Sequence, residues 1–496
     1  MKQFRRSVLF SILFLIGMSV AVAQKKVPPL TKIAPDLLRE DLALLKNILE
    51  ANHPSLYWYT PKDSMDAYFE NALHSLTDSL NEVQFKNKVA YIISKIRCGH
   101  TAVRFSKAYS KKATLYRYPQ FPLSLKAWSD SLVVLNSVVA KDPIFKRGTI
   151  ITGINGMSNR HLLDTIFQFM STDGYSENYK NQVVSGNFPA WYKTILGVDS
   201  VYSISYIDST GKDTTALVKS FTPILDTLKK NRPELLPGMV KPTRKQLRKA
   251  GQLANRSMVI DTSSSTAIMR VATFTGGNLN RFFRRSFKTI QQQDIKHLVI
   301  DLRENGGGKV RNSALLAQYL ADHSFRVGDS VVAISRKFRY GRYIKPSILY
   351  WLSMNFSAKK MDDGLIHLRY YETKEFKPKE KNHFSGDLYL VQGGYSFSAT
   401  TMFISYLKNQ SNVKVVGEET GGGYYGTSAM HIPTIHLPHT GIQVSLPMYR
   451  LVMDARRPKG HGIIPDIEVQ PSSQAIKKGI DLKMAKIKEM IQGKQK

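Results

Sequence analysis

The stretch IKHLVIDLRENGGGKV, residues 295–310, contains a short apolar run, a polar end and three successive glycines. A run of this length bounded by polar residues predicts a buried strand. From residue 264 onward strands and helices alternate, and this alternation predicts an α/β core with parallel pairing. The other expected elements are TAIMRVATF (266–274), NSALLAQYLADH (312–323), GDLYLVQGG (386–394), 399–408 and VKVVGEET (413–420).

The glycine loop follows the end of this strand at Asp301 and contains Gly306, Gly307 and Gly308. Glycine allows a close approach of the backbone and leaves N–H groups free for a phosphate or an oxyanion. No Gly-Lys-Ser/Thr follows at the spacing of a phosphate-binding loop. A tight strand-to-helix turn also explains the glycines, so the loop alone assigns no chemistry.

The segment GGYSFSATTMF, residues 393–403, places Ser398 between a predicted strand and a predicted helix. A serine here suits a helix cap and a nucleophile equally well, because helix-end N–H groups converge on it. The nucleophilic role requires a base that takes the proton and donors that hold the developing negative charge.

The segment RCGHTAVRF, residues 97–105, contains His100 and the only cysteine, Cys98, so an intramolecular disulfide is excluded. A lone histidine can be purely structural. A Cys98–His100 pair is disfavoured, because residues two apart on one strand share a face, whereas a nucleophile and its base normally come from separate elements.

Regions of different composition flank the core. Leucines at 38, 42, 45 and 49 form one helix face, and INGMS (154–158) predicts a tight turn. Residues 338–385 form a basic, aromatic insertion that the pattern does not place. The predicted division is a signal peptide at 1–23, a helical domain at 36–105, a β-rich domain at 115–221, a basic linker at 222–262, the α/β core at 263–471 and a basic terminal helix at 472–496.

The amino terminus has a basic start, an apolar stretch and AVA before Gln24, which predicts a secretory signal cleaved after Ala23. An uncleaved membrane anchor is the alternative. We therefore expect a periplasmic or secreted protein.

The charge balance is strongly basic, with 71 Lys+Arg against 38 Asp+Glu and a formal net charge of +33. The charges are scattered and no nucleic-acid module is present, so we expect no nucleic-acid partner. Contact with an anionic envelope surface suits this charge better.

Taken together, LVIDLRENGGG, GGYSFSATTMF and VVGEETGGG resemble, in order and spacing, the C-terminal processing and tricorn-like serine peptidases. CGHT resembles the amino-terminal part of that family, GTIITGINGMS resembles the carrier-loop end of a PDZ-like domain, and GHGIIPDIEV resembles the closing motif of the catalytic domain. The resemblance implies a crotonase-like (ββα spiral) catalytic core, an N-terminal helical region and a PDZ-like β-rich domain at 115–221.

By this resemblance Ser398 is the nucleophile and His100 its base. The oxyanion hole comprises the N–H groups of Ala399 and Gly307, with Gly308 as the alternative donor. One branch of the family uses a lysine in the glycine turn after the next strand, where this sequence has glycine, so a Ser-His rather than a Ser-Lys enzyme is implied.

The third catalytic residue is the least defined. Asp454 is our candidate for orienting His100, with Glu418 and Glu419 as alternatives, whereas Asp301 and Asp466 are expected to fix turns. HLPH (436–439) lies in a strand region, and we expect neither a metal site nor a cofactor.

The sequence thus predicts an exported serine peptidase that cleaves polypeptides through an acyl-enzyme, at or near free C-termini. Two alternatives stay open: a non-catalytic peptide- or ligand-binding protein on the same scaffold, and a hydrolase of esters or cell-wall peptides. The sequence leaves the oligomeric state undefined.

Overall fold

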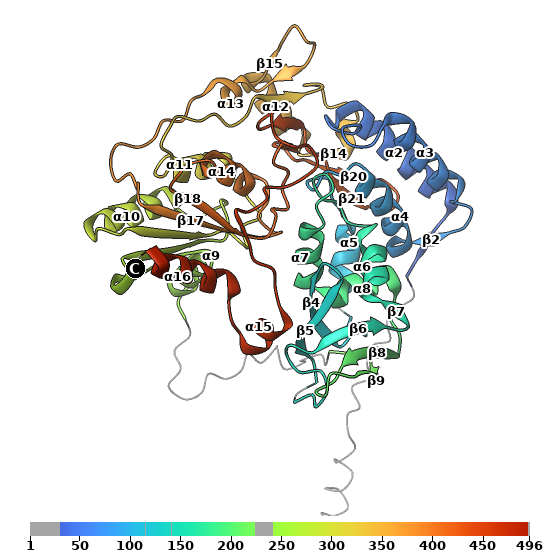
Figure 1. Ribbon diagram of the computed structural model, residues 1–496. Coiled ribbons are helices and arrows are strands. Elements are labelled where there is room, and N and C mark those ends of the chain that lie inside the picture. Colours follow the sequence, from blue (N-terminus) through green and yellow to red (C-terminus); the bar gives the residue numbers. More distant parts are fainter. Residues whose placement is uncertain (1–29, 115, 140, 224–241, 495–496) are drawn as a thin grey trace, which may run out of the picture.

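The computed structural model describes residues 30–114, 116–139, 141–223 and 242–494. A six-stranded sheet has the order β10-β11-β12-β17-β18-β23 and lies on the left in Figure 1. The strand β10 pairs antiparallel and the other neighbours pair parallel, which confirms the predicted α/β core. The strands are β10 (Arg256–Asp261), β11 (Thr266–Val271), β12 (His297–Asp301), β17 (Asp387–Gln392), β18 (Val413–Gly417) and β23 (Ile467–Glu468).

Both faces of this sheet are buried, as the near-continuous apolar strands require. In β12, Leu298 and Ile300 face the main hydrophobic core, while Val299 faces a smaller cluster with Ile487 and Ile491. The first face packs against α10 (Leu279–Gln292), α11 (Val310–Ala317) and α14 (Ala399–Leu407), and the second against α16 (Leu482–Lys494).

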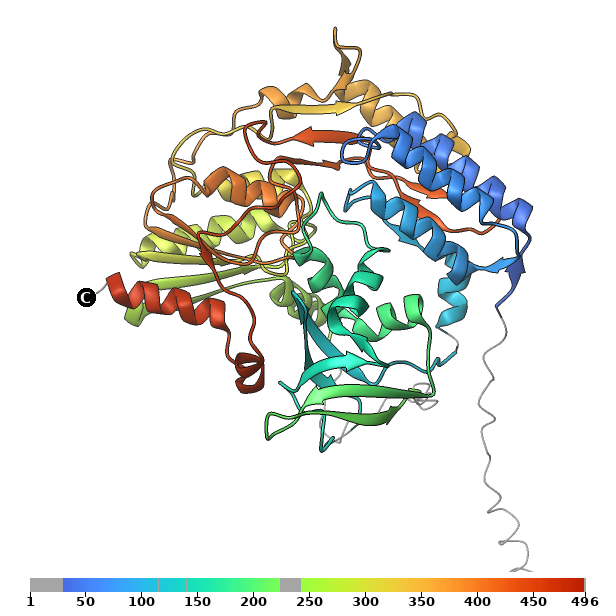
Figure 2. The same cartoon turned by 45° about the vertical axis from the view of Figure 1, so that its right-hand side comes forward.

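The N-terminal helices share the main core with the central sheet. The predicted helix face is confirmed, because Leu38, Leu42, Leu45 and Leu49 are fully buried. Figure 2 shows these helices (blue) side by side, above the β-rich domain. They are α2 (Pro35–Asn52), α3 (Lys62–His74) and α4 (Glu82–Lys95), with β1 (Lys32–Ile33) and β2 (Leu80–Asn81) paired beside them.

The β-rich domain has a hydrophobic core of its own. The predicted turn is confirmed: Asn155 and Gly156 have positive φ between two paired strands, and a helix follows. The strands are β4 (Leu123–Trp128), β5 (Ser131–Ser137), β6 (Ile150–Ile154), β7 (Met157–Ser158), β8 (Val201–Ile207) and β9 (Asp213–Lys219). The helices are α6 (Asn159–Phe167), α7 (Asn178–Gly186) and α8 (Phe188–Leu196).

Two further antiparallel sheets complete the fold. One has the order β15-β16-β13-β22-β19 and the other β14-β20-β21-β3. The pairing of β3 with β21 carries the chain that follows His100 into the C-terminal half of the molecule. The strands are β3 (Val103–Arg104), β13 (Ser330–Ala333), β14 (Ile344–Lys345), β15 (Lys359–Lys360), β16 (Ile366–His367), β19 (Gly426–Ala429), β20 (Thr434–His436), β21 (Gln443–Ser445) and β22 (Tyr449–Val452). The remaining helices are α5 (Lys107–Ala113), η2 (Thr262–Ser264), η3 (Gly341–Tyr343), α12 (Ser347–Ser357) and α13 (Arg369–Thr373).

Two predicted segments differ from the structure. The predicted linker 222–262 contains α9 (Arg244–Asn255) followed directly by β10, because Thr243 and Gln246 form a capping box that starts a helix. The C-terminal segment forms two helices rather than one, since Gly479 (φ 68°) ends α15 (Ser473–Lys478) before α16 begins.

The predicted signal peptide 1–23 lies outside the described residues. Within the described part of the chain no helix is long and apolar enough to cross a membrane.

Candidate active site

Ser398 sits on a sharp turn between strand β17 and helix α14. Its backbone has φ 56° and ψ −124°, and its side chain makes no capping hydrogen bond. A positive φ at a non-glycine residue stores strain, roughly 1–3 kcal/mol, and such residues cluster at functional sites. The same kind of strand-turn-helix geometry exposes the nucleophilic serine of α/β-hydrolases. Of the two roles the sequence left open for Ser398, the structure therefore disfavours the helix cap.

Neighbouring residues hold this turn in place. The Ser396 hydroxyl donates to the Leu302 carbonyl at 2.9 Å, and the Phe397 N–H donates to the Asn305 carbonyl at 3.2 Å. Both acceptors lie in the loop after β12. Hydrogen bonds therefore connect the glycine loop to the Ser398 turn at the carboxyl ends of the adjacent parallel strands β12 and β17.

His100 reaches this turn from the end of the N-terminal helical region. Its Nε2 lies 3.1 Å from the Ser398 Oγ, and its Nδ1 lies 3.2 Å from the Thr427 Oγ1. The ring packs against Phe397, with 4.9 Å between ring centroids. The predicted meeting of two side chains 298 positions apart is therefore present in the structure.

The protonation state of His100 follows from this packing. Burial lowers the pKa of the imidazole to about 4, because removal from water disfavours the charged form. The ring is therefore neutral at neutral pH. A proton on Nδ1, donated to Thr427, leaves Nε2 free to accept the proton of Ser398.

Thr427 in turn lies beside Asp173, a buried carboxylate from the segment between α6 and α7. Asp173 accepts hydrogen bonds from the N–H groups of Gly99 at 2.8 Å and Gly423 at 3.4 Å. Burial raises the pKa of Asp173 to about 6, while hydrogen bonds from Gly99, Thr427 and Gly423 act in the opposite direction. The carboxylate therefore fixes the loops on both sides of the His100 ring.

Sequence reasoning missed both Asp173 and Thr427. Asp173 stands in STDGYS within the predicted β-rich domain, and no motif connects it to His100. Only the tertiary structure brings these residues together.

The amide donors near Ser398 correct one prediction. The Gly307 N–H is already donated to the Asn305 side chain at 2.9 Å, so it is not a free donor. Among the described residues, no acceptor takes the N–H groups of Ala399 or Gly308. The Gly307 amide is thus engaged in a local turn, and Gly308 stays the alternative donor.

Gly307 has a steric role instead. A Cβ on Gly307 would lie 2.8 Å from the Ser398 Cβ and 3.1 Å from the Ala399 nitrogen. Its φ of 102° is also a conformation that side-chain-bearing residues rarely adopt. Only glycine allows the loop to approach the serine this closely.

Residues 265–469 match the sequence model described as Peptidase family S41. Over these residues the chain is similar to peptidase family S41, and we call this segment the S41 domain. The S41 domain is that of a serine-type peptidase. No curated protein sequence matches the chain.

Solved structures show where the fold recurs. Mature CPAF complexed with lactacystin superposes with a TM-score of 0.60 at 14% identity, over 92% of this chain and 98% of that chain. Mature CPAF alone gives 0.58 at 14% identity, over 89% and 94%. At this identity the likeness shows a shared fold, and it extends beyond the S41 domain across nearly the whole chain. The predicted α/β fold class is confirmed, and the β-rich domain, which we predicted to be PDZ-like, lies beside the catalytic core.

The structure also corrects the predicted role of Asp454 as the residue that orients His100. Its carboxylate accepts hydrogen bonds from Arg456 at 2.8 Å and Arg457 at 2.9 Å, and these contacts lower its pKa to about 2. His100 Nδ1 contacts Thr427 instead. Asp454 is thus committed to local arginines rather than to His100.

The other acids are also engaged elsewhere. Glu418 pairs with Lys483 at 2.7 Å, and Glu419 accepts from the Gly462 N–H at 2.6 Å. Asp466 accepts from the Val415 N–H of strand β18 at 2.8 Å, so it links distant segments rather than fixing a turn as we predicted.

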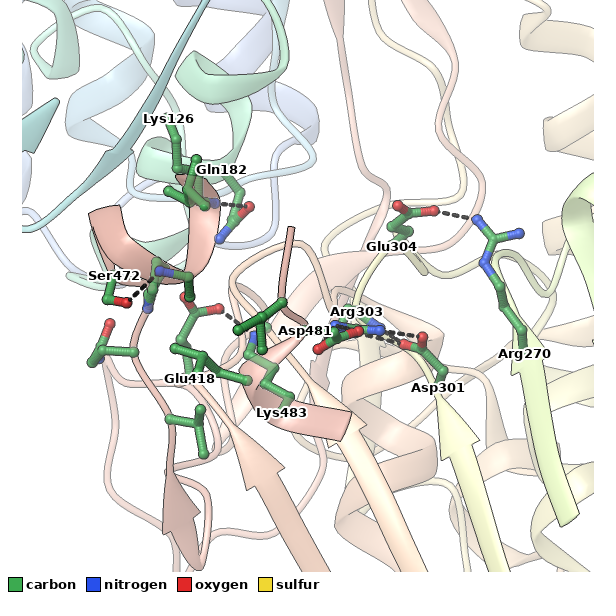
Figure 3. Close-up of a pocket in the computed structure, with 18 residues that line it drawn as sticks. Lys126, Gln182, Arg270, Asp301, Arg303, Glu304, Glu418, Ser472, Asp481 and Lys483 are labelled. Atoms are coloured by element: carbon green, nitrogen blue, oxygen red, sulfur yellow. Dashed lines mark hydrogen bonds and ion pairs between the residues drawn. The ribbon is translucent and has the colours of Figure 1, made fainter. Parts of the chain in front are cut away.

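Glu418 and Asp301 line the cavity of about 610 Å³ drawn in Figure 3, between the PDZ-like domain and the S41 domain. The figure shows Glu418 directed at Lys483, and Asp301 bonded to Arg303, which also pairs with Asp481. These ion pairs fasten the C-terminal helix to the strand ends. Ser398 and His100 do not line this cavity, so we treat it as a domain junction.

The Cys98 thiol is unreactive. Burial raises the pKa of its thiol to about 12, and its Sγ faces the Ser428 carbonyl at 3.8 Å rather than His100. The thiolate is the reactive form, so this cysteine is not a competing nucleophile.

Proposed function

We propose that the protein is an exported serine peptidase in which Ser398 is the nucleophile and His100 the general base. The observation that carries the proposal is the 3.1 Å contact between His100 Nε2 and Ser398 Oγ on a strained turn beside two unengaged amides.

In the acylation step, His100 Nε2 takes the Ser398 proton as Oγ bonds to the scissile carbonyl carbon. The carbonyl oxygen becomes an oxyanion that accepts hydrogen bonds from the N–H groups of Ala399 and Gly308. Collapse of this intermediate breaks the C–N bond, and the leaving amine receives the proton from His100. An acyl-enzyme remains.

Deacylation repeats these steps with water. His100 removes a proton from the water molecule as the water oxygen attacks the ester carbonyl carbon. The ester bond to Ser398 then breaks, and the proton returns to Oγ as the new carboxylic acid leaves.

In both steps a positive imidazolium forms. We assign a positioning role to Thr427 and Asp173: Thr427 holds Nδ1, and the Asp173 carboxylate behind it stabilises the positive charge. This arrangement takes the place of the acid that we expected at Asp454.

The position of the PDZ-like domain supports polypeptide substrates. Its helix α7 packs on the nucleophile turn, with Tyr179 and Phe397 ring centroids 5.0 Å apart. A peptide that adds as a strand to this domain would lie close to Ser398. We infer cleavage at or near free C-termini, because such ends suit capture by a PDZ-like domain.

The mechanism is tested with a fluorophosphonate probe and a fluorogenic peptide. We expect labelling of the wild type and none of Ser398→Ala, and a loss of kcat of at least about 10²-fold in His100→Gln. Ser405→Ala is the matched control, since this hydroxyl on the same helix only donates to the Met402 carbonyl at 2.7 Å. An unlabelled wild type with tight peptide binding would favour the binding-protein alternative.

Specificity and export need separate measurements. A peptide with a free C-terminus should be cleaved faster than the same peptide amidated, and cleavage of a peptide bond at all would exclude a hydrolase restricted to esters. N-terminal sequencing of the secreted protein should begin at Gln24. Equal rates for free and amidated peptides would refute the C-terminal preference while leaving the peptidase proposal intact.

A further inference from the structure

Helix α12, in the insertion that the sequence pattern did not place, turns an apolar face toward solvent. Phe356 is 88% exposed and Ile348 74%. We call this surface the α12 patch; it comprises Ile348, Leu349, Trp351, Leu352 and Phe356. Positions 348, 352 and 356 are spaced by four, so they lie on one side of the helix.

The opposite side of α12 anchors the helix to the protein. Met354 is fully buried, the Ser353 hydroxyl lies 2.8 Å from His431 Nε2, and the Tyr350 ring meets the His431 ring at 5.1 Å. The apolar face is therefore held outward by the fold, which reverses the usual orientation of an amphipathic surface helix. An exposed apolar patch of this kind marks an interaction site.

The chain around the patch is cationic. Residues 335–361 contain seven basic residues and no acidic residue. Lys345 lies two positions before α12, and Lys359 and Lys360 follow its end; all three are exposed. The basic residues are Arg336, Lys337, Arg339, Arg342, Lys345, Lys359 and Lys360.

We propose that the α12 patch docks the protein on an anionic lipid surface. Trp, Phe and Leu side chains on one helix face enter the boundary between headgroups and acyl chains, and flanking Lys and Arg attract anionic lipids. The helix has 11 residues, far fewer than a bilayer span needs, so it lies in the plane of the membrane.

A second copy of the chain fits this surface less well. Two such faces would bring together two cationic rims on chains whose formal net charge is +33 each. An anionic membrane instead neutralises the rim while it covers the apolar side chains.

Docking through α12 also orients the molecule. In Figure 1, α12 lies at the top and strands β8 and β9 of the PDZ-like domain lie at the bottom. The PDZ-like domain would therefore point away from the membrane, which leaves it open to polypeptides in the surrounding compartment.

The test measures binding of the purified full chain to vesicles of phosphatidylcholine alone and with 30% phosphatidylglycerol. We expect binding to the anionic vesicles that weakens with salt, and at least tenfold weaker binding of the double variant Ile348→Gln/Phe356→Gln. Leu217→Gln, at a 77% exposed position on β9, is the matched control and should bind like the wild type.

A local readout separates the patch from any contribution of the N-terminal segment. Vesicles with brominated acyl chains should quench the tryptophan fluorescence of the wild type, and Trp351→Phe should lose that quenching while still binding. Circular dichroism checks that each variant is folded.

Three results would overturn the proposal: no preference for anionic vesicles, undiminished binding of the double variant, or no quenching of Trp351. A dimer in light scattering that Ile348→Gln/Phe356→Gln dissociates would also overturn it, in favour of a second copy as the occupant.

Discussion

The low pKa of His100 predicts a peptidase that stays active in acid. A histidine with an ordinary pKa of 6.5 would be about 3% neutral at pH 5, whereas one with a pKa of about 4 is about 90% neutral. Since only the neutral ring accepts the Ser398 proton, kcat/KM at pH 5 should be about 30-fold higher than an ordinary histidine would allow. The part of the acid limb that His100 itself contributes should have its midpoint near pH 4.

The assay follows cleavage of a fluorogenic peptide from pH 3 to 8. Asp173, whose pKa is raised to about 6, titrates in the same range, so the profile is recorded for Asp173→Asn as well. A midpoint near 6.5 that persists in Asp173→Asn would refute the reasoning, because His100 would then be titrating as an exposed ring.

The profile must be read on folded protein. The pKa values of His100 and of buried His53, lowered to about 4 and about 3, lie below 6.5 in the folded state. The folded state therefore binds fewer protons than the unfolded chain, and stability falls as the pH drops below 6.5. Circular dichroism at each pH separates this loss from the loss of activity.

Three further predictions concern the surroundings of the site. Gly307→Ala should lower kcat at least about 10-fold, because the new methyl group displaces Ser398, while the affinity for the peptide changes little. An unchanged kcat would contradict the close contact between the Gly307 loop and Ser398. Thr427→Val should lower kcat about 10-fold while KM stays constant, and Thr427→Ser should restore it; a fall in thermal stability without a kinetic effect would indicate a purely structural role. Lys483→Met should destabilise the protein by about 3–5 kcal/mol in urea unfolding, because it leaves the buried Glu418 carboxylate unpaired, and Lys483→Met/Glu418→Gln should recover much of the loss.

Some of this architecture could be predicted because the signal is local. The leucines at 38 to 49 and the apolar strands define buried faces through their spacing alone. The order of the motifs around Ser398 and His100 then indicated a meeting of distant residues. The helix at Arg244–Asn255 was missed because its charge suggested a linker, although the capping-box residues Thr243 and Gln246 were visible in the sequence.

Other parts of the site could not be predicted, because residues close in sequence compete for the hydrogen bonds of a candidate site residue and a motif does not show this competition. Asp454 is followed two and three residues later by arginines that hold its carboxylate. Asn305 precedes Gly307 by two residues, and its side chain takes that amide in a local turn. Asp173 could not be predicted at all, because only packing of the PDZ-like domain brings it behind Thr427.

The separation of Ser398 and His100 along the chain has a consequence for biosynthesis. A chain that is synthesised amino terminus first contains His100 long before it contains Ser398. The pair forms only when β3 has found β21, near the end of synthesis. The order of translation therefore delays activity. The chain would become able to cleave peptides only after its C-terminal third has folded against its N-terminal third.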